Sequence, residues 1–385
     1  MEERARWGGE RLSGERRELA RALGSLVGWK GPEFLRFLKY WGGDPRRWWE
    51  SEDPLRGACG STKKIVRDLR ELHQEGREST LVKVRSWPGE TMLFGEKGYP
   101  EGLLTMKSSP AVIHLQGNRD ALRRPGLAVV GSRKIGVRTA KAASTILRGL
   151  VRTGVVLISG GALGADGVAH EASVRAGKPT VAVLPSGLGR WTPRSHEKLF
   201  ETILEAGGAL ISEYAPFETV RKYHFRRRNE LIAALSEAVF VLRAAEESGT
   251  MLTVKAAGTL GRALAAMPGE PDDPLSVGCH RIIQEGGELI ASSEDLLRWW
   301  RGLGPWEERL EEREEKEIRQ GSLVPECPVL SEARGLREGD GGVSLEALIR
   351  ATGRSAGEIQ ALLLEYELAG LVERLDSGER FRLTW

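Results

Sequence analysis

The run Leu127-Ala-Val-Val-Gly-Ser-Arg133 opens the stretch that decides the fold, an apolar segment that ends in a Gly-Ser-Arg turn. The segment 155–159 repeats this arrangement and is followed by Gly160-Gly-Ala-Leu-Gly164. Further apolar runs alternate with helix-like segments as far as Gly269, and a glycine-rich or polar turn follows nearly every run. This order predicts an open parallel α/β sheet that binds its ligand at the carboxyl ends of the strands.

The strands expected in this core are short and rich in Val, Ile and Leu, without the alternation typical of a sheet that has one solvated face. Helices should therefore cover both faces of the sheet. The expected strands are residues 127–130, 155–159, 180–184, 210–212, 238–242 and 264–267. The expected core helices are 136–153, 164–176, 195–206, 229–235 and 250–261, preceded by a connector with a helix at 63–74 and strands at 81–87 and 111–115.

The composition limits the classes of protein to consider. The 385 residues allow two or three domains with a sizeable core. No apolar run approaches membrane-spanning length and the charged N-terminus lacks a secretory segment, so we expect a cytoplasmic protein that does not enter membranes. The net charge is only +3, so a polyanionic partner would be held by a local patch. The spacing of Cys59, Cys279 and Cys327 predicts neither a metal site nor a disulfide framework.

Smaller units flank the core. Leucines at helical spacing and a tryptophan cluster predict a helical prefix, which either packs on the core or contacts nucleic-acid backbone as a helix-hairpin-helix type module. The C-terminal segment has the helix–helix–hairpin order of a winged-helix module, but few bases on its second helix, which argues against binding in a DNA groove. The expected domains are 1–58 (helical, SAM or helix-hairpin-helix-like), 59–300 (core), 301–342 (charged helix and linker) and 343–385 (winged-helix-like).

Two turns are suited to bind phosphate. Gly131-Ser-Arg133 ends a strand just before a helix, so backbone amides, a helix N-terminus and a guanidinium meet there. Ser248-Gly-Thr250 at a later helix start provides a further anion nest. The first turn has neither GxGxxG spacing nor the Lys-Ser/Thr of a Walker motif, and an ordinary strand-to-helix turn is the alternative interpretation.

The sharpest local signal is Arg221-Lys-Tyr-His-Phe-Arg-Arg-Arg-Asn229, in which five of the first eight residues are Lys or Arg and aromatic residues are interleaved. Cations that follow phosphates and aromatic faces that stack on bases hold single strands without reading their sequence. The alternative, a merely solvated charged face, leaves the aromatic residues unexplained. Asp166 and His170 share one face of an expected helix, where a structural role is favoured over acid–base chemistry because no nucleophile or third member accompanies them.

Taken in order, these blocks resemble the DNA-processing protein A (DprA/Smf) family of bacterial transformation. The similarity covers about residues 95–298. The motifs that carry it include Tyr99-Pro100, Val130-Gly-Ser-Arg133, Ser159-Gly160, Gly164, Asp166, Ala169-His170, Ser212-Glu213, Phe225, Arg228-Asn229, Ser248-Gly-Thr250, Thr253 and Pro268-Gly269.

The resemblance implies an extended Rossmann-like parallel sheet core, flanked by the helical domain and the winged-helix-like module, that binds single-stranded DNA and forms a homodimer. It also implies protection of incoming DNA and loading of the RecA recombinase during natural transformation, without catalysis, metal or cofactor. By motif position, Arg133 would contact phosphate, Lys222 would line the strand's pocket and Phe225 would stack on a base. The residues that would shape the pocket are Gly131, Ser132, Gly160, Arg228, Asn229, Ser248, Gly249 and Thr250.

Some positions depart from the family pattern. Glu230 stands where the family usually has a second arginine. Further departures are Gly161, Ala165, Gly189, Thr192, His196 and His280. Two other functions stay open, a nucleotide-processing enzyme on the same fold and a sensor that binds a small nucleotide. Similar phosphoribohydrolases need a catalytic glutamate where this chain has Thr253, which argues against the enzyme.

Overall fold

The structure, a computed structural model, describes residues 14–53, 55–58, 61–85, 87–304, 342–368, 372–375 and 380–383. The chain folds into two compact units, residues 1–304 and 305–385. The greater part of the charged helix and linker expected at 301–342 lies outside the described residues, as do Cys59 and Cys327.

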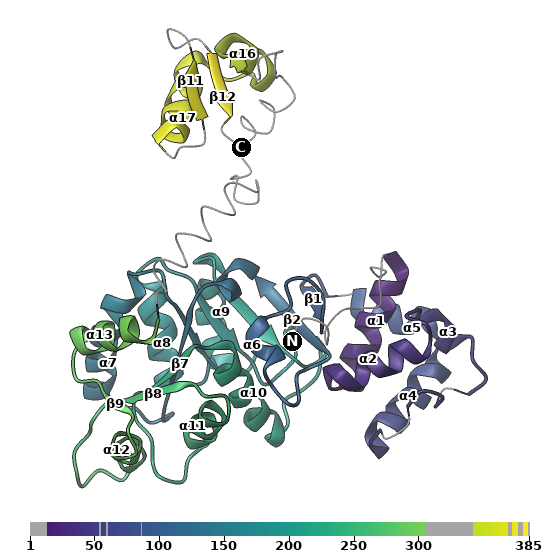
Figure 1. The fold of residues 1–385 in the computed structure, drawn as a ribbon, viewed down its shortest axis with the longest axis horizontal. Coiled ribbons are helices and arrows are strands. Elements are labelled where there is room, and N and C mark those ends of the chain that lie inside the picture. Colours follow the sequence, from purple (N-terminus) through teal and green to yellow (C-terminus); the bar gives the residue numbers. More distant parts are fainter. Residues whose placement is uncertain are drawn as a thin grey trace. The chain divides into compact units, whose positions relative to one another are not determined.

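A mixed sheet forms the centre of the first unit (Figure 1). In the described residues it has nine strands in the order β1-β2-β6-β5-β4-β3-β7-β8-β9. They are β1 (Glu90–Leu93), β2 (Val112–Gly117), β3 (Gly126–Val130), β4 (Val156–Ser159), β5 (Thr180–Val183), β6 (Ala209–Ser212), β7 (Ala238–Val241), β8 (Ala263–Ala266) and β9 (Glu288–Leu289). All neighbours from β6 to β9 are parallel, whereas β2 runs antiparallel to both β1 and β6. The predicted parallel α/β core is confirmed, with an antiparallel edge that was not predicted.

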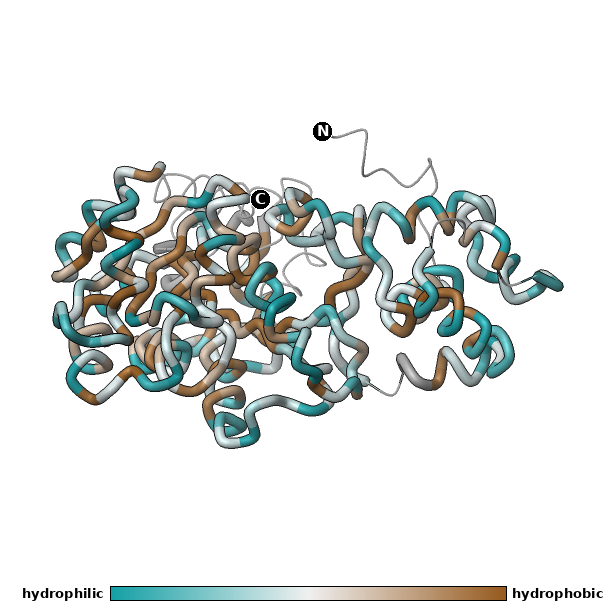
Figure 2. The backbone as a smooth tube through the Cα atoms, turned by 90° about the horizontal axis from the view of Figure 1, so that it is seen from below, coloured by the Kyte–Doolittle hydropathy of each residue, from teal (hydrophilic) through white to brown (hydrophobic). Residues whose placement is uncertain are grey.

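Helices cover both faces of this sheet. Figure 1 shows α7, α8, α9 and α13 on one side of the strands and α10, α11 and α12 on the other. Their bounds are α7 (Val137–Val151), α8 (Ala165–Val174), α9 (Glu197–Glu205), α10 (Lys222–Leu235), α11 (Gly249–Thr259), α12 (Val277–Gln284) and α13 (Ser293–Leu303), with the short α6 (Glu101–Leu104) beside α10. Every residue of β3, β4, β5, β6 and β7 is buried. Figure 2 shows hydrophobic segments of the chain lying between more hydrophilic ones. Burial on both faces explains why the strands carry no alternating pattern.

The helical prefix packs on the core instead of standing apart from it. Its helices are α1 (Gly14–Val27), α2 (Gly31–Tyr40), α3 (Arg46–Trp49), α4 (Lys63–Glu75) and α5 (Arg77–Arg85). Trp48 is fully buried and its ring lies 6.1 Å from that of Phe37, so the tryptophan cluster does form the prefix core. Val112 of β2 belongs to the same cluster, and α1 contacts both β1 and β2.

The prediction of a strand at residues 81–87 is wrong. The chain instead forms α5 (Arg77–Arg85), which lies against α1. The alternation of β-branched residues suggested a strand, but contact with the neighbouring helix decided the conformation. The helix expected at 229–235 also begins seven residues earlier, at Lys222, so the basic and aromatic stretch forms its first two turns.

The second unit has the predicted winged-helix order. It consists of β10 (Gly342–Ser344), α16 (Leu345–Thr352), α17 (Ala356–Leu368), β11 (Val372–Leu375) and β12 (Arg380–Leu383). The strands form an antiparallel sheet in the order β10-β12-β11. The hydroxyl of Ser344 accepts a hydrogen bond from the N–H of Ala347 at 3.3 Å and so caps the N-terminus of α16.

Candidate functional site

The strand order reverses between β3 and β7, and the crevice at such a point is where open α/β sheets bind their ligands. The turn after β3 and the chain just after β7 meet there: the N–H of Ser132 donates to the carbonyl of Arg243 at 2.7 Å. The turn after β4 joins them, since the N–H of Ala165 donates to the carbonyl of Ser132 at 3.2 Å. The two predicted Gly-rich turns therefore lie together at the carboxyl edge of the sheet.

Glycine is required where these turns touch. A Cβ on Gly131 would lie 2.8 Å from the Cβ of Ala165 and 3.0 Å from the carbonyl oxygen of Arg243. Gly164 has a φ of +80°, and a Cβ there would lie 2.5 Å from the carbonyl oxygens of Ser132 and Arg133. Both glycines thus allow a close backbone approach that leaves Arg133 projecting at the surface.

Arg133 meets the predicted aromatic residue of α10. Its guanidinium carbon lies 5.2 Å from the ring centroid of Phe225, within the range of a cation–π contact. Lys222 precedes Phe225 by three residues and so lies on the same side of the helix. Arg133 and Lys222 are exposed and Phe225 is half-buried. Residues from two separate parts of the chain thus place two cations beside a half-buried aromatic ring.

The start of α11 adjoins the same face of α10. The side-chain amide of Asn229 donates to the carbonyl of Gly249 at 2.9 Å, which fixes the two helices together. The hydroxyl of Ser248 donates to the carbonyl of Ala245 at 3.0 Å and does not cap α11. Thr250 is buried. The first-turn amides of α11 therefore add partial positive charge near the cations.

Arg228 is buried, with 5% of its surface exposed, and holds α10 against the sheet. Its Nη1 donates to the carbonyl of Gly160 and, at 3.3 Å, to that of Val183, while its Nε donates to Asn229 Oδ1 at 3.0 Å. Asp166 lies 3.8 Å from the guanidinium. Burial lowers the pKa of Arg228, and burial raises the pKa of Asp166 against the attraction of the arginine. Arg228 therefore shapes the site from inside and does not project toward a ligand.

The structural interpretation of Asp166 and His170 is confirmed. The carboxylate of Asp166 accepts from the N–H of Ala162 at 3.2 Å in the first turn of α8. His170 is fully buried and its Nδ1 lies 2.9 Å from the hydroxyl of Thr180. Burial, and to a lesser extent the positive charges nearby, lowers the pKa of His170 to about 3. A histidine in this state is not poised for acid–base chemistry near neutral pH.

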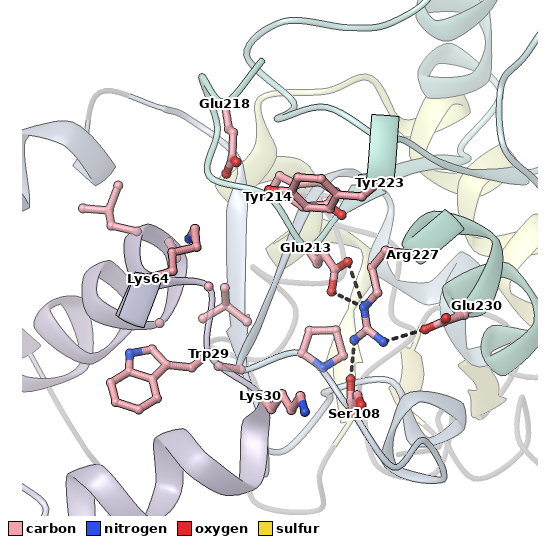
Figure 3. Close-up of a pocket in the computed structure, with 17 residues that line it drawn as sticks. Trp29, Lys30, Lys64, Ser108, Glu213, Tyr214, Glu218, Tyr223, Arg227 and Glu230 are labelled. Atoms are coloured by element: carbon pink, nitrogen blue, oxygen red, sulfur yellow. Dashed lines mark hydrogen bonds and ion pairs between the residues drawn. The ribbon is translucent and has the colours of Figure 1, made fainter. Parts of the chain in front are cut away.

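Arg227 is also committed to internal contacts. Figure 3 shows its guanidinium directed at Glu213, Glu230 and the carbonyl of Ser108. The nearest N–O distances to both carboxylates are 2.9 Å. Burial opposes its charge, but these carboxylates raise the pKa of Arg227 overall. Only part of the predicted basic stretch is therefore available to a ligand.

Arg243, a residue that was not predicted from the sequence, fastens the turn after β3. Its guanidinium donates to Asp273 at 3.0 and 2.7 Å, and its Nη1 donates to the carbonyls of Lys134 and Ile135 at 3.1 and 3.0 Å. A hydrogen bond from Ser276, together with Arg243, lowers the pKa of Asp273. The only signal in the sequence was the position of Arg243 directly after the β7 run.

A cavity of about 420 Å³ lies between the prefix and the core, and Arg227 is one of the residues that line it. Lys30 and Lys64 from the prefix line this cavity together with Tyr214 and Glu218 from the core (Figure 3). Its lining includes three cations and three carboxylates, so no net charge favours an anionic ligand. None of the eleven predicted site residues is among the described residues that line it.

The described ranges contain no group of three His, Cys, Asp or Glu side chains that could hold a metal ion. Cys279 is buried, and burial raises the pKa of its thiol to about 11. Within the same ranges, no helix combines the length and the apolar character needed to cross a membrane.

Comparison with known proteins places this geometry in a family. The family profile described as DNA recombination-mediator protein A matches residues 90–301, and the DprA winged helix domain matches residues 339–378. The chain is 38% identical over 199 residues to the DNA processing protein DprA of Streptococcus pneumoniae, covering 52% of this chain and 70% of that protein. It is 33% identical over 281 residues to Protein Smf of Escherichia coli, covering 73% of this chain and 74% of that protein.

Solved structures agree. DNA processing protein A from Streptococcus pneumoniae superposes with a TM-score of 0.61 at 29% identity, covering 75% of this chain and 98% of that one. DNA processing protein A from Helicobacter pylori shares the fold, with a TM-score of 0.51 at 24% identity, covering 56% of this chain and 97% of that one. Because the recombination-mediator profile spans more than half of the chain and includes the strand switch point, the chain belongs to the DprA/Smf family of DNA recombination mediators.

Proposed function

We propose that this chain binds single-stranded DNA at the strand switch point and acts as a recombination mediator with no catalytic step of its own. The observation that carries the proposal is Arg133 lying over Phe225, beside Lys222, at the carboxyl edge of the sheet. Cations for phosphates beside an aromatic face for a base are the elements of single-strand binding. The Helicobacter pylori protein that shares the fold binds single-stranded DNA, which supports the proposal.

Each predicted residue takes a role that fits its position. Arg133 and Lys222 bind phosphates and Phe225 stacks on a base. Two glycines leave room for close backbone contact, and Arg228 and Asn229 fix α10 from within. The residues that shape the site are Gly131, Ser132, Gly160, Arg228, Asn229, Ser248, Gly249 and Thr250.

The test is a salt titration of binding to a fluorescent single-stranded oligonucleotide, with the duplex of the same sequence as competitor. We expect the logarithm of the binding constant to fall linearly with the logarithm of salt concentration, by about 0.7 for each phosphate contact. The duplex should compete poorly. Absence of salt-sensitive binding to single strands would contradict the proposal.

The same titration is paired with a thermal-unfolding screen against mononucleotides. A ligand that binds only the folded state raises the melting temperature, so a sensor of small nucleotides would show a concentration-dependent rise. We expect none. Thr253, buried in α11 at the position where similar phosphoribohydrolases need an acid, supports the absence of glycosidic cleavage.

We further infer that the protein forms a homodimer through its Rossmann-like core, protects incoming DNA and loads RecA onto it during natural transformation. Membership of the recombination-mediator family supports this inference. Light scattering of the full chain measures the oligomeric state. RecA assembly on a labelled single strand, with and without this protein, measures the hand-off, and an unchanged assembly rate would contradict RecA loading.

A further inference from the structure

A second concave surface lies beside the proposed DNA site. This groove, of about 280 Å³, runs between the loop after α6, helix α10 and helix α11. Its lining includes Met106 and Lys107 of that loop and Arg226, Glu230, Leu252 and Lys255 of the two helices. Sequence reasoning did not single it out, because the loop after α6 lies more than 100 residues before the two helices that complete the groove.

The floor of this groove is apolar and accessible. Met106, Leu252, Ala256 and Leu260 contribute to it, and Leu252 is 40% exposed. An apolar surface this open on a solvated face is suited to contact a flat apolar group, such as one face of a nucleobase.

The rim of the groove is positive. Lys107, Arg226 and Lys255 are exposed, and neither lysine forms an ion pair with any described residue. Glu230 lies 3.9 Å from Arg226, but Arg226 is 73% exposed, and such a pair contributes little in water. Arg227 also forms an ion pair with Glu230, at 2.9 Å. The three cations on the rim are therefore available to an anionic partner, unlike the balanced charges of the cavity in Figure 3.

The groove is continuous with the proposed DNA site along α10. Arg226 follows Phe225 directly and lies one helical turn, about 6 Å along the axis, beyond Lys222. The bond from Asn229 to Gly249 holds α10 and α11 together at this end. Arg227 fastens the opposite wall by donating to the carbonyl of Ser108. The walls are thus fixed before any ligand binds.

We propose that this groove holds the next part of the same DNA strand. A base lies on the floor formed by Leu252 and Met106, and the flanking phosphates meet Arg226, Lys255 and Lys107. The inference rests on the proposed function, because the strand reaches the groove from Phe225. It adds that the binding site is longer than the switch point alone and continues across the α10–α11 face.

The experiment compares strands of different length. The shortest oligonucleotide that the wild-type chain binds reports on the switch point, and a series of longer ones reports on the extension. In the double variant Lys107→Glu, Lys255→Glu, affinity for the long strands should fall on the order of tenfold or more, and the salt slope should decrease by about 1.4 for two lost phosphate contacts. Affinity for the shortest strand should stay within about twofold of wild type, because charges beyond its reach are screened at physiological salt.

Two further variants sharpen the result. Leu252→Ala shortens the floor without changing charge, so it should weaken long-strand binding with an unchanged salt slope. Lys39→Glu makes the same substitution at one exposed lysine on α2 of the prefix, and should leave both strand lengths bound as in wild type. Thermal unfolding of each variant checks that the fold is retained.

The outcomes separate this inference from the proposed function. If the groove variants bind every length like wild type while Lys222→Ala weakens all lengths, the groove is not on the strand's path and the inference is overturned alone. If mononucleotides bind the wild type but not Lys255→Glu, while long-strand affinity is unchanged, the groove is a nucleotide site and the inference is again overturned. If the wild type binds no single strand, both proposals fall.

Discussion

The guanidinium of Arg228 occupies the space that a side chain on residue 160 would need. A Cβ on Gly160 would overlap Nη1 of Arg228, the same atom that donates to the carbonyl of Gly160. The two positions are therefore interdependent, although they are 68 residues apart. This contact sets how closely α10, which carries Lys222 and Phe225, approaches the end of β4.

Gly160→Ala should destabilise the protein by about 1–3 kcal/mol, because the buried arginine or the backbone must move to admit the methyl group. Urea unfolding measures the loss. Gly258→Ala is the matched control: Gly258 lies in α11 with open space where its Cβ would be, so alanine there should be neutral or stabilise by up to about 1 kcal/mol. Equal unfolding midpoints for the two variants would contradict the packing argument.

Phe225→Ala should weaken single-strand binding by about 1–3 kcal/mol through lost stacking. Tyr223→Ala is the control, because Tyr223 is also exposed at the start of α10 but lines the cavity next to the prefix. Fluorescence anisotropy with one oligonucleotide compares them. A larger loss for Tyr223→Ala would move the stacking surface to the other side of α10.

Lys222→Ala should lower affinity and reduce the salt slope by about 0.7, as expected for one lost phosphate contact on a single strand. A weaker affinity with an unchanged slope would mean that the lysine acts through something other than phosphate. Binding measured at four or more salt concentrations distinguishes the two results.

Glu230→Gln should strengthen binding by about two- to fivefold at low salt, because it removes an acid from a basic face and releases Arg226 from a weak surface pair. The gain should fade at high salt. Glu237→Gln, which removes a carboxylate paired with Arg262 before β7, is the control and should not change binding. A Glu230→Gln variant that binds no better than wild type would show that Arg227 already neutralises this acid.

His170 should make the fold sensitive to acid. Thr180 donates its single hydroxyl proton to the carbonyl of Leu157 at 2.6 Å, so Nδ1 of His170 must carry the proton that it shares with Thr180. Its Nε2 is buried without a partner among the described residues. The pKa of His170 falls from 6.5 to about 3 on folding, so the unfolded chain takes up this proton at a higher pH than the folded chain does. The free energy of unfolding therefore decreases as pH falls from about 6.5 toward 3.

Between these two pH values, each histidine that is buried in its neutral form adds about 1.4 kcal/mol per pH unit to the slope of the unfolding free energy against pH. His170→Gln should remove one such contribution between pH 6 and 4, and urea unfolding at several pH values across this window measures the slope. A His170→Gln slope equal to that of wild type would contradict the buried neutral histidine.

The sequence predicted the core well because its signals are local. Each apolar run of β3 to β8 is followed by a turn, and this pattern fixes strand positions to within about two residues. The edge strands β1 and β9 were not predicted because Glu90–Leu93 and Glu288–Leu289 are short and carry no distinct apolar run. Their pairing comes from neighbours already in place.

The site was predicted in part for the same reason. Composition identified the basic and aromatic stretch, but it did not show that Arg227 and Arg228 point inward, because their partners lie on distant strands and loops. The contact between Arg243 and Asp273 likewise joins positions 30 residues apart, with α11 and β8 between them in the chain. Partners that meet only in the folded state leave no spacing pattern in the chain.

The two acceptors that hold Arg228 at the ends of β4 and β5 are main-chain carbonyls, those of Gly160 and Val183. A carbonyl is present whatever side chain the residue carries, so residue 183 is free to change among buried apolar types without loss of this bond. Position 160 has no such freedom, since its Cβ would meet the arginine. Over evolutionary time these two main-chain bonds of Arg228 are thus exposed to mutation at codons 160 and 228, whereas codon 183 can vary.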